Sequence, residues 1–360
     1  MQYLENMMIA AEETKKEEAV GVETRGHPTE LKTYIMESNN GLPRIQGSES
    51  LRVFPSPTKL PQISVLRLEY SRLSAIFYLD ATDPRFLLLY TNDVADITDK
   101  LYSRLVESST NSFDRIWLPT EVQDKISHLS GNVFRGFGLS FNDLFALEKR
   151  RELPIDELRM SASGVRSGRA LEALNKDTML KRSLCYSKIK VERGNSQSFV
   201  TDEVRFNGRV ITKSGQSIDD HVSLIEIIRK IYRNLIEEIE QNSIGTRQVE
   251  GRTLIEGQAF ELILDRQIED LDRFSERLLS SSKPFRLWGI VNKISKDMRQ
   301  IVAVDLHTGD PLNLEITPSL IRIYLSRGAC GNTVLRLYVN TQHGFDSAIR
   351  FNGETKLGTM

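Results

Sequence analysis

Short apolar runs, separated by turn-forming residues, follow one another through the first third of the chain. Several of them alternate apolar and polar positions, which is typical of strands with one buried face. Proline and aspartate between the runs favour short antiparallel connections. The runs that predict this strand meander are residues 51–54, 63–70, 73–79 and 85–90, followed by a shorter strand at 115–118.

The residues after the meander favour helices before two more strands. Residues 96–107 fit a helix or an edge element, and Thr120 followed by Glu121 predicts a helix start that leads to residue 129. Residues 179–193 and 198–213 alternate apolar and charged positions, which predicts two long strands. The further helices expected in this part are residues 141–150, 153–160 and 165–175.

The clearest helix signal of the chain begins at Ser217 and runs to residue 240. Ser217 is a favourable N-cap, and Asp219 and Asp220 lie in the first turn, where the helix dipole favours negative charge. Apolar residues recur at intervals of three and four, so we expect a broad face to be buried at a domain junction or against a partner. The side chains predicted for this interface are Val222, Ile225, Ile228, Tyr232, Leu235 and Ile239.

The last part of the chain predicts a second region rich in strands. A helix at residues 267–280 leads through a short linker into this region. Turn chemistry between the runs, as in Thr308-Gly309-Asp310-Pro311, favours a small and strongly bent sheet or partial barrel. The four short strands expected here are residues 285–291, 300–306, 312–316 and 332–339.

These patterns predict an α+β fold with an N-terminal antiparallel sheet and helices, a long central helix and a C-terminal small β-barrel-like module. A chain of 360 residues exceeds one ordinary core, so two or three domains are expected. The expected segments are a mobile leader at 1–48, an α+β domain at 49–176, a strand hairpin with the long amphipathic helix and a connecting helix at 177–282, and a small β-module at 283–360.

The composition narrows the class of protein. Hydrophobic residues make up 39% of the chain and charged residues 27%, with a net charge of −1, so nucleic-acid binding would need a local basic patch. Cys185 and Cys330 are too few for a disulfide framework or a cysteine metal site, and the five histidines are scattered. We therefore predict no metal and no cofactor. The absence of a targeting or membrane-spanning segment favours a cytoplasmic protein with no membrane partner.

No sequence motif identifies catalytic residues, which stay unknown. Gly136 and Gly138 precede a helix expected to begin after Ser140 and could approach a phosphate, but the P-loop ending is missing and a plain loop is favoured. Cys185 is expected to be a buried, inert thiol. His343 lies in a polar stretch that favours a hydrogen-bonded loop over a small binding site.

A second candidate is a metal-dependent nuclease site near Gly257. Glu261 and Asp265, followed by Arg266, have the residue types that hold Mg²⁺ in such enzymes. The lysine expected at short spacing is missing, so the pattern has little specificity.

Local charge gives the better functional signal. Residues 150–193 hold eleven Lys/Arg against six Asp/Glu, and residues 283–350 hold nine against five. Basic side chains on one face would contact phosphates, and aromatic residues such as Trp288 would stack on bases, unless these aromatics belong to the core. The candidate nucleic-acid-binding residues are Arg166, Arg169, Lys181, Arg182, Lys188, Lys190, Arg193, Arg286, Lys293 and Arg299.

The leading hypothesis is a non-enzymatic binding or assembly protein whose ligand is DNA, RNA or another protein. If the two basic segments do not meet, the C-terminal β-region is expected to dock another protein instead. The alternatives are a metal-dependent nuclease or other hydrolase with dispersed catalytic residues, and an oligomeric structural subunit that associates through the helix at 217–240. A role in prokaryotic antiviral defence or in a mobile element is a further hypothesis.

Overall fold

The computed structural model describes residues 2–19, 30–38, 50–107, 113–145, 157–177, 180–249, 252–280 and 284–352. The chain divides into two compact units, each assembled from separate segments. The first unit comprises Met1–Ile116, Ile126–Gly136 and Lys188–Lys230. The second unit comprises Trp117–Lys125, Phe137–Ser187 and Ile231–Met360. The four sequential segments expected from the sequence remain a prediction of the domain boundaries.

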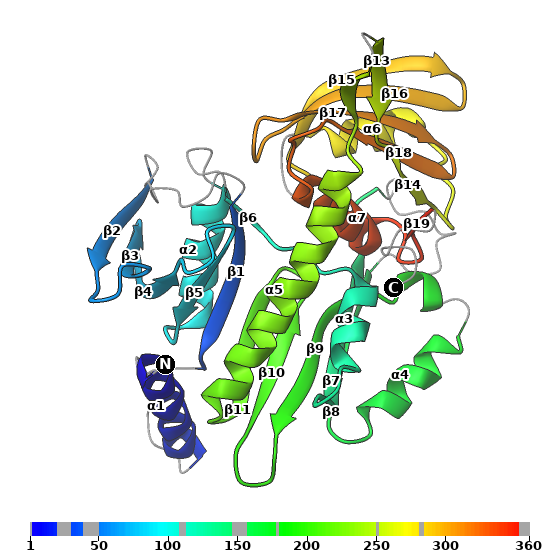
Figure 1. Ribbon diagram of the computed structural model, residues 1–360. Helices are drawn as coiled ribbons and strands as arrows, with labels where there is room; N and C mark the ends of the chain where they lie inside the picture. Colours follow the sequence, from blue (N-terminus) through cyan, green and yellow to red (C-terminus); the bar gives the residue numbers. More distant parts are fainter. Residues whose placement is uncertain are drawn as a thin grey trace. The chain divides into compact units, whose positions relative to one another are not determined.

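An antiparallel sheet forms the frame of the first unit (Figure 1). Its strand order includes β2-β3-β4-β5-β1-β11-β10-β9, and β6 pairs with β1. The predicted meander is confirmed as β2 to β5. The bounds are β1 (Lys32–Ser38), β2 (Leu51–Pro57), β3 (Ile63–Tyr70), β4 (Leu73–Asp80), β5 (Phe86–Thr91), β6 (Phe113–Arg115), β9 (Tyr186–Gly194), β10 (Phe199–Arg205) and β11 (Arg209–Gly215).

The predicted mobile leader is wrong for the residues of β1. This strand pairs with β5, β11 and β6, and every one of its residues is buried. Residues 2–19 form helix α1 (Gln2–Ala19), whereas residues 20–29 and 39–49 lie outside the described residues. Charged neighbours hid the strand, because Lys32 and Glu37 are themselves fully buried in it.

Helix α2 (Ala95–Glu107) packs on the strands of the first unit and confirms the helical alternative for this stretch. Its buried face carries Leu101 and Leu105 at the spacing of one helical turn. These side chains join Phe77, Leu89 and Phe113 in one hydrophobic core. The sheet is therefore covered by a helix that its own apolar periodicity predicts.

Helix α5 (Ile218–Gln241) forms at the predicted place. Its first part, to Lys230, belongs to the first unit, and its second part, from Ile231, belongs to the second. Of the predicted interface residues, Val222 is half-buried and the rest are fully buried, namely Ile225, Ile228, Tyr232, Leu235 and Ile239. The apolar face of α5 is thus covered by the chain itself and offers no free surface for a partner.

In two of the expected helices, 141–150 and 153–160, the described residues form strand, loop or turn. Strand β7 (Val133–Asn142) includes Gly136 and Gly138, so these glycines are not in a loop before a helix. Strand β8 (Glu157–Ser163) replaces the helix expected at 153–160, and residues 146–156 lie outside the described residues. The other elements here are α3 (Thr120–Ser127), α4 (Ser167–Asn175), η1 (Leu180–Ser183), β12 (Gly245–Val249) and β13 (Arg252–Glu256).

A six-stranded antiparallel sheet dominates the second unit, and α6 (Leu271–Leu278) lies against one of its faces (Figure 1). Its order is β15-β16-β17-β18-β14-β19. Leu271, Phe274 and Leu278 of α6 are buried at helical spacing. The bounds are β14 (Phe260–Ile263), β15 (Leu287–Ser295), β16 (Met298–Asp305), β17 (Pro311–Thr317), β18 (Leu320–Leu325) and β19 (Arg350–Phe351).

The expected fold class is wrong as a whole. The C-terminal sheet is open, because its strand order ends at β15 and β19 and does not close into a barrel. The stretch expected as its fourth strand is helix α7 (Asn332–Gly344), and α5 does not stand as a separate central element because it is shared by the two units. Within the described residues, no helix is long and apolar enough to cross a membrane.

Candidate functional site

The face of the six-stranded sheet opposite α6 exposes a row of large apolar side chains. Trp288 and Ile290 of β15 and Val302 of β16 are 57%, 64% and 51% exposed. Ile290 pairs with Val302, and Trp288 pairs with the half-buried Val304. We call Trp288, Ile290, Val302 and Val304 the apolar face. Adjoining exposed apolar side chains on two strands are unusual on a free surface and are typical of a binding surface.

The other half of the same sheet face is polar and internally paired. Arg322 of β18 bonds Glu261 of β14 at 2.6 Å and lies 3.6 Å from Glu315 of β17. The hydroxyl of Tyr324 donates to Glu315 at 2.9 Å. On this face, the large exposed apolar side chains therefore lie on the β15–β16 half.

Strand β15 also forms one end of the strand order. Among the described strands, none pairs with its outer side. Its first six residues, 287–292, contain neither a charge nor a proline, and Lys293 is the one charged residue of the strand. Edge strands without charge or proline are the edges that pair with another strand. The apolar face and the open edge thus lie on the same strand.

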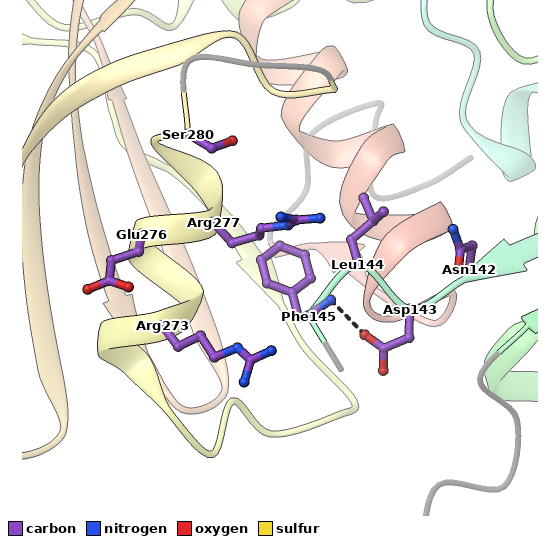
Figure 2. Close-up of a pocket in the computed structure, with 8 residues that line it drawn as sticks. All are labelled: Asn142, Asp143, Leu144, Phe145, Arg273, Glu276, Arg277 and Ser280. Carbon is purple, nitrogen blue, oxygen red and sulfur yellow. Dashed lines mark hydrogen bonds between the residues drawn. The ribbon is translucent and has the colours of Figure 1, made fainter. Parts of the chain in front are cut away.

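A pocket of about 540 Å³ lies between the end of β7 and helix α6 (Figure 2). Its walls are fixed by aromatic packing, because Phe145 stacks on Phe274 at 4.3 Å and contacts the edge of Phe345 at 5.4 Å between ring centroids. The lining residues are Asn142, Asp143, Leu144, Phe145, Arg273, Glu276, Arg277 and Ser280.

Two arginines and two carboxylates line this pocket, and they differ in how they are placed. The side chain of Asp143 is 1% exposed and forms an ion pair with Arg266 at 2.7 Å. Arg266 does not line the pocket and compensates the charge of Asp143. Figure 2 shows the guanidinium groups of Arg273 and Arg277 extending from α6 toward Leu144 and Phe145. The carboxylate of Glu276 extends from the other side of the helix in the same view. Glu276 lines the pocket as well, so its wall carries charges of both signs.

Polar side chains of α3 and α7 form a buried cluster within the second unit. Oε1 of Glu121 accepts from the Tyr338 hydroxyl at 3.1 Å and from Nε2 of Gln342 at 2.9 Å. Oε2 of Glu121 is buried and has no hydrogen-bond partner among the described atoms. Burial raises the pKa of the Glu121 carboxyl. These contacts support a structural role for the cluster.

Cys185 and His343 belong to the same region; Cys185 is buried and His343 is half-buried. The Cys185 thiol donates to the carbonyl of Gln342 at 2.9 Å, and burial raises the pKa of the thiol. This confirms the predicted buried thiol. His343 lies in the last turn of α7, where Nδ1 is 3.1 Å from the Ser140 carbonyl, and burial lowers the pKa of its ring to about 4.

The basic residues expected to bind nucleic acid are divided between the two units. Lys188, Lys190 and Arg193 lie on the part of β9 that belongs to the first unit. Lys188 forms an ion pair with Glu203 at 2.9 Å. Arg166 and Arg169 are exposed at α4 in the second unit. Lys181 and Arg182 lie in η1, and their side chains lie outside the described residues.

The basic residues of the C-terminal sheet are largely held by acidic partners. Arg299 is buried and forms an ion pair with Asp272, which also pairs with Lys293 at 3.4 Å. Arg286 is half-buried beside β15 and donates to the Leu306 carbonyl at 3.4 Å. These contacts leave little free positive charge on β15 and β16.

The residues of the predicted nuclease site have structural contacts. Glu261 is held by Arg322 and by Nδ2 of Asn352 at 2.6 Å each. Arg266 is held by Asp143. Gly257 has a positive φ of 90°, and an added Cβ would lie 2.2 Å from the Ser243 carbonyl oxygen. Glu261, Arg266 and Gly257 therefore each have a local reason to be present that involves no metal.

Sequence reasoning named Trp288 but assigned it either to base stacking or to the core. It did not single out Ile290 or Val302, or the two arginines of the pocket. The alternation of residues 287–291 was the available signal, but both sides of the strand are apolar, so the sequence alone does not tell which side is covered.

The described residues form a protein of helices and mostly antiparallel sheets, with an exposed apolar sheet face and a pocket in the second unit. Residues 2–358 match the family described as MJECL33-like protein, and the chain belongs to that family. The chain is similar to the uncharacterized protein MJECL33 of Methanocaldococcus jannaschii, with 30% identity over an alignment of 359 positions, and the match covers 88% of this chain and 85% of the relative.

Proposed function

We propose that this protein is a non-enzymatic assembly protein, and that two copies associate through strand β15 and the apolar face. The observation that carries the proposal is the exposure of Trp288, Ile290 and Val302 beside an open strand edge. Apolar side chains of this size stabilise an interface when they leave water, at about 25 cal/mol per Å².

The composition of β15 favours a second copy as the occupant. Two identical edge strands pair antiparallel around a two-fold axis, so each residue faces a residue equally far from the axis. With the axis at Val291, Trp288 faces Ile294, and Lys293 faces Gly289. The two lysines repel each other directly only if the axis passes through Lys293 itself. The edge is therefore compatible with its own copy over most registers.

The nucleic-acid form of the binding hypothesis has less support. The candidate basic residues are divided between two units, and Lys188, Lys293 and Arg299 each have an acidic partner. An electrophoretic shift with DNA and RNA at two salt concentrations tests this form, because phosphate contacts weaken steeply with salt. A strong, salt-sensitive shift would favour nucleic acid over a second copy as the ligand.

Sedimentation velocity tests the assembly directly. We expect the unsubstituted protein to sediment as a dimer over a concentration series. Ile290→Lys places a charge in the apolar face and should give a monomer with an unchanged melting temperature. Val165→Lys is the matched control, because Val165 is an exposed apolar residue of the same unit that lies outside β15 and β16. A monomer at every concentration contradicts the proposal.

A cytoplasmic location is part of the same proposal. Cys185 and Cys330 are both buried and free of disulfide bonds, which fits a reducing compartment. Cell fractionation of a tagged chain tests this, and recovery with a membrane or secreted fraction would contradict it.

A further inference from the structure

We infer that strand β13 of the β12–β13 hairpin pairs with β13 of a second copy of this chain. The inference goes beyond the assembly through β15, because none of the hairpin residues lies on β15 or β16. The hairpin forms a separate two-stranded sheet, and among the described strands none pairs with the outer side of β13. An isolated two-stranded hairpin is only marginally stable in water, so further strands would stabilise it.

The hairpin exposes apolar side chains on both of its faces. Leu254 is 48% exposed and Ile255 is 78% exposed. Neighbouring residues of a strand point to opposite faces, so these two side chains lie on different sides of the hairpin. A strand added beside β13 would take part of both side chains out of water.

The root of the hairpin is anchored on both strands. Ile244 N donates to the Leu325 carbonyl and Arg327 N donates to the Ile244 carbonyl, at 2.7 Å each. After the second strand, Gln258 N donates to the Asn242 carbonyl at 2.9 Å. The hairpin is therefore held in a fixed direction, and a partner would order few further groups on binding.

The sequence of β13 favours a second copy as the partner. Two identical strands pair antiparallel around a two-fold axis, so residues equally far from the axis face each other. With the axis at Leu254, Arg252 faces Glu256 of the other copy, and Thr253 faces Ile255. Facing residues of opposite charge stabilise a strand pair. The edge of β13 is thus complementary to itself.

Strand β12 lacks this complementarity. The same operation centred on Arg247, the middle residue of β12, sets two arginines against each other. Within its own chain, Glu256 forms ion pairs with Arg247 and Arg327 at 3.2 Å each. Arg252 of a second copy would share this carboxylate, so backbone hydrogen bonds and apolar burial supply most of the stabilisation.

The contact is small and needs a trap to be detected. A pair of five-residue strands is far smaller than a standard interface of about 1,600 Å², so we expect a weak contact that forms at high protein concentration. Leu254→Cys places a thiol at the two-fold axis, where facing Cβ atoms lie about 4.5–5.5 Å apart, within reach of a disulfide after small shifts. The two native cysteines are buried and do not compete.

Oxidation of the full chain with copper(II) phenanthroline, followed by non-reducing electrophoresis, tests the pairing. We expect Leu254→Cys to form a disulfide-linked dimer. Thr246→Cys is the matched control, because Thr246 is exposed on β12 and does not lie on the paired edge. Equal yields in the two variants would mean random collision, and no linked product in Leu254→Cys would mean no pairing. Either result overturns the inference.

A charge reversal checks the register. Arg252→Glu in the Leu254→Cys chain sets two carboxylates against each other across the axis, and it should lower the yield of linked dimer roughly threefold. An unchanged yield would overturn the pairing centred on Leu254.

The combination of Ile290→Lys with Leu254→Cys separates this test from that of the β15 assembly. Ile290 lies outside the hairpin, so linked dimer should still form when association through β15 is lost. A linked product that disappears with Ile290→Lys would assign the contact to the β15 assembly and would overturn a separate role for β13.

Discussion

His221 and Asp202 form a fully buried pair in the first unit, with Nδ1 of the imidazole 2.9 Å from Oδ2 of the carboxylate. On the other side of the ring, Nε2 lies 2.9 Å from Oγ1 of Thr33. This order of groups resembles a catalytic triad. All three side chains are 0% exposed, however, so no substrate reaches the hydroxyl and the arrangement stabilises the sheet.

We predict that His221→Leu lowers the free energy of unfolding by about 3 kcal/mol, because it leaves the Asp202 carboxylate buried with fewer partners. Thr212 still donates to Oδ1 of Asp202 at 2.9 Å and limits the loss. Urea denaturation followed by circular dichroism measures the change. A double-mutant cycle with Asp202→Asn should give a coupling of roughly 1 kcal/mol or more. Additive effects would contradict a direct pair.

Gly257 gives a second stability prediction. Its φ is +90°, and an added Cβ would lie 2.2 Å from a backbone oxygen of Ser243, so neither the backbone nor the neighbour can accept a side chain. We expect Gly257→Ala to destabilise the second unit by roughly 1–3 kcal/mol. Gly309→Ala is the matched control, because Gly309 also has a positive φ but has open space around its Cβ position. Equal melting temperatures for the two variants would rule out the steric cause.

Replacing the Glu121 carboxyl should increase the stability of the fold by an amount that depends on pH. Burial raises the folded-state pKa of Glu121 above the unfolded value. The contribution of this carboxyl to stability therefore falls as pH rises from the unfolded pKa to the folded pKa. Glu121→Gln removes the buried charge and can still accept from Tyr338 and Gln342. We expect the variant to be more stable by roughly 1 kcal/mol at pH 7, with the advantage shrinking at pH 4. Chemical denaturation at both pH values measures this, and a variant that is less stable at pH 7 contradicts it.

Strands β2 to β5 of the first sheet could be predicted because each has its own local pattern, whereas β1 could not. The two strands within residues 63–80 alternate in part between buried and exposed positions, and a turn separates the two strands. Helix α7 could not be predicted in this way. Twelve of its thirteen residues are buried, polar ones such as Arg336 and Gln342 included, so its polar side chains do not mark a side that faces solvent. The β-branched and aromatic residues 333–339 then imitate a strand.

The candidate surfaces could be predicted only in part, because exposure depends on what covers each face. Leu287 and Trp288 are neighbours of equal apolar character, yet one is 1% exposed and the other 57%, because α6 covers one side of β15. Arg299 looks like a surface cation in the sequence, but Asp272, which is distant in the chain, engages it. Pairings over such distances leave no local sequence signal.

The His343 ring predicts how stability changes in mild acid. Its folded-state pKa is about 4, whereas an unburied histidine titrates near 6.5. Between these values the unfolded chain takes up a proton that the folded chain does not, so stability falls as pH is lowered from 6.5 to 4. The full loss from this group is about 3 kcal/mol.

His343→Asn separates this effect from that of the carboxylates that also titrate in acid. The asparagine amide can donate to the Ser140 carbonyl in place of Nδ1, and it does not titrate. We therefore expect the variant to lose less stability than the unsubstituted protein when pH falls from 7 to 4.5, in urea denaturation followed by tryptophan fluorescence. Identical losses in the two proteins would show that the ring takes up its proton without unfolding, and that its burial in the last turn of α7 does not resist charge.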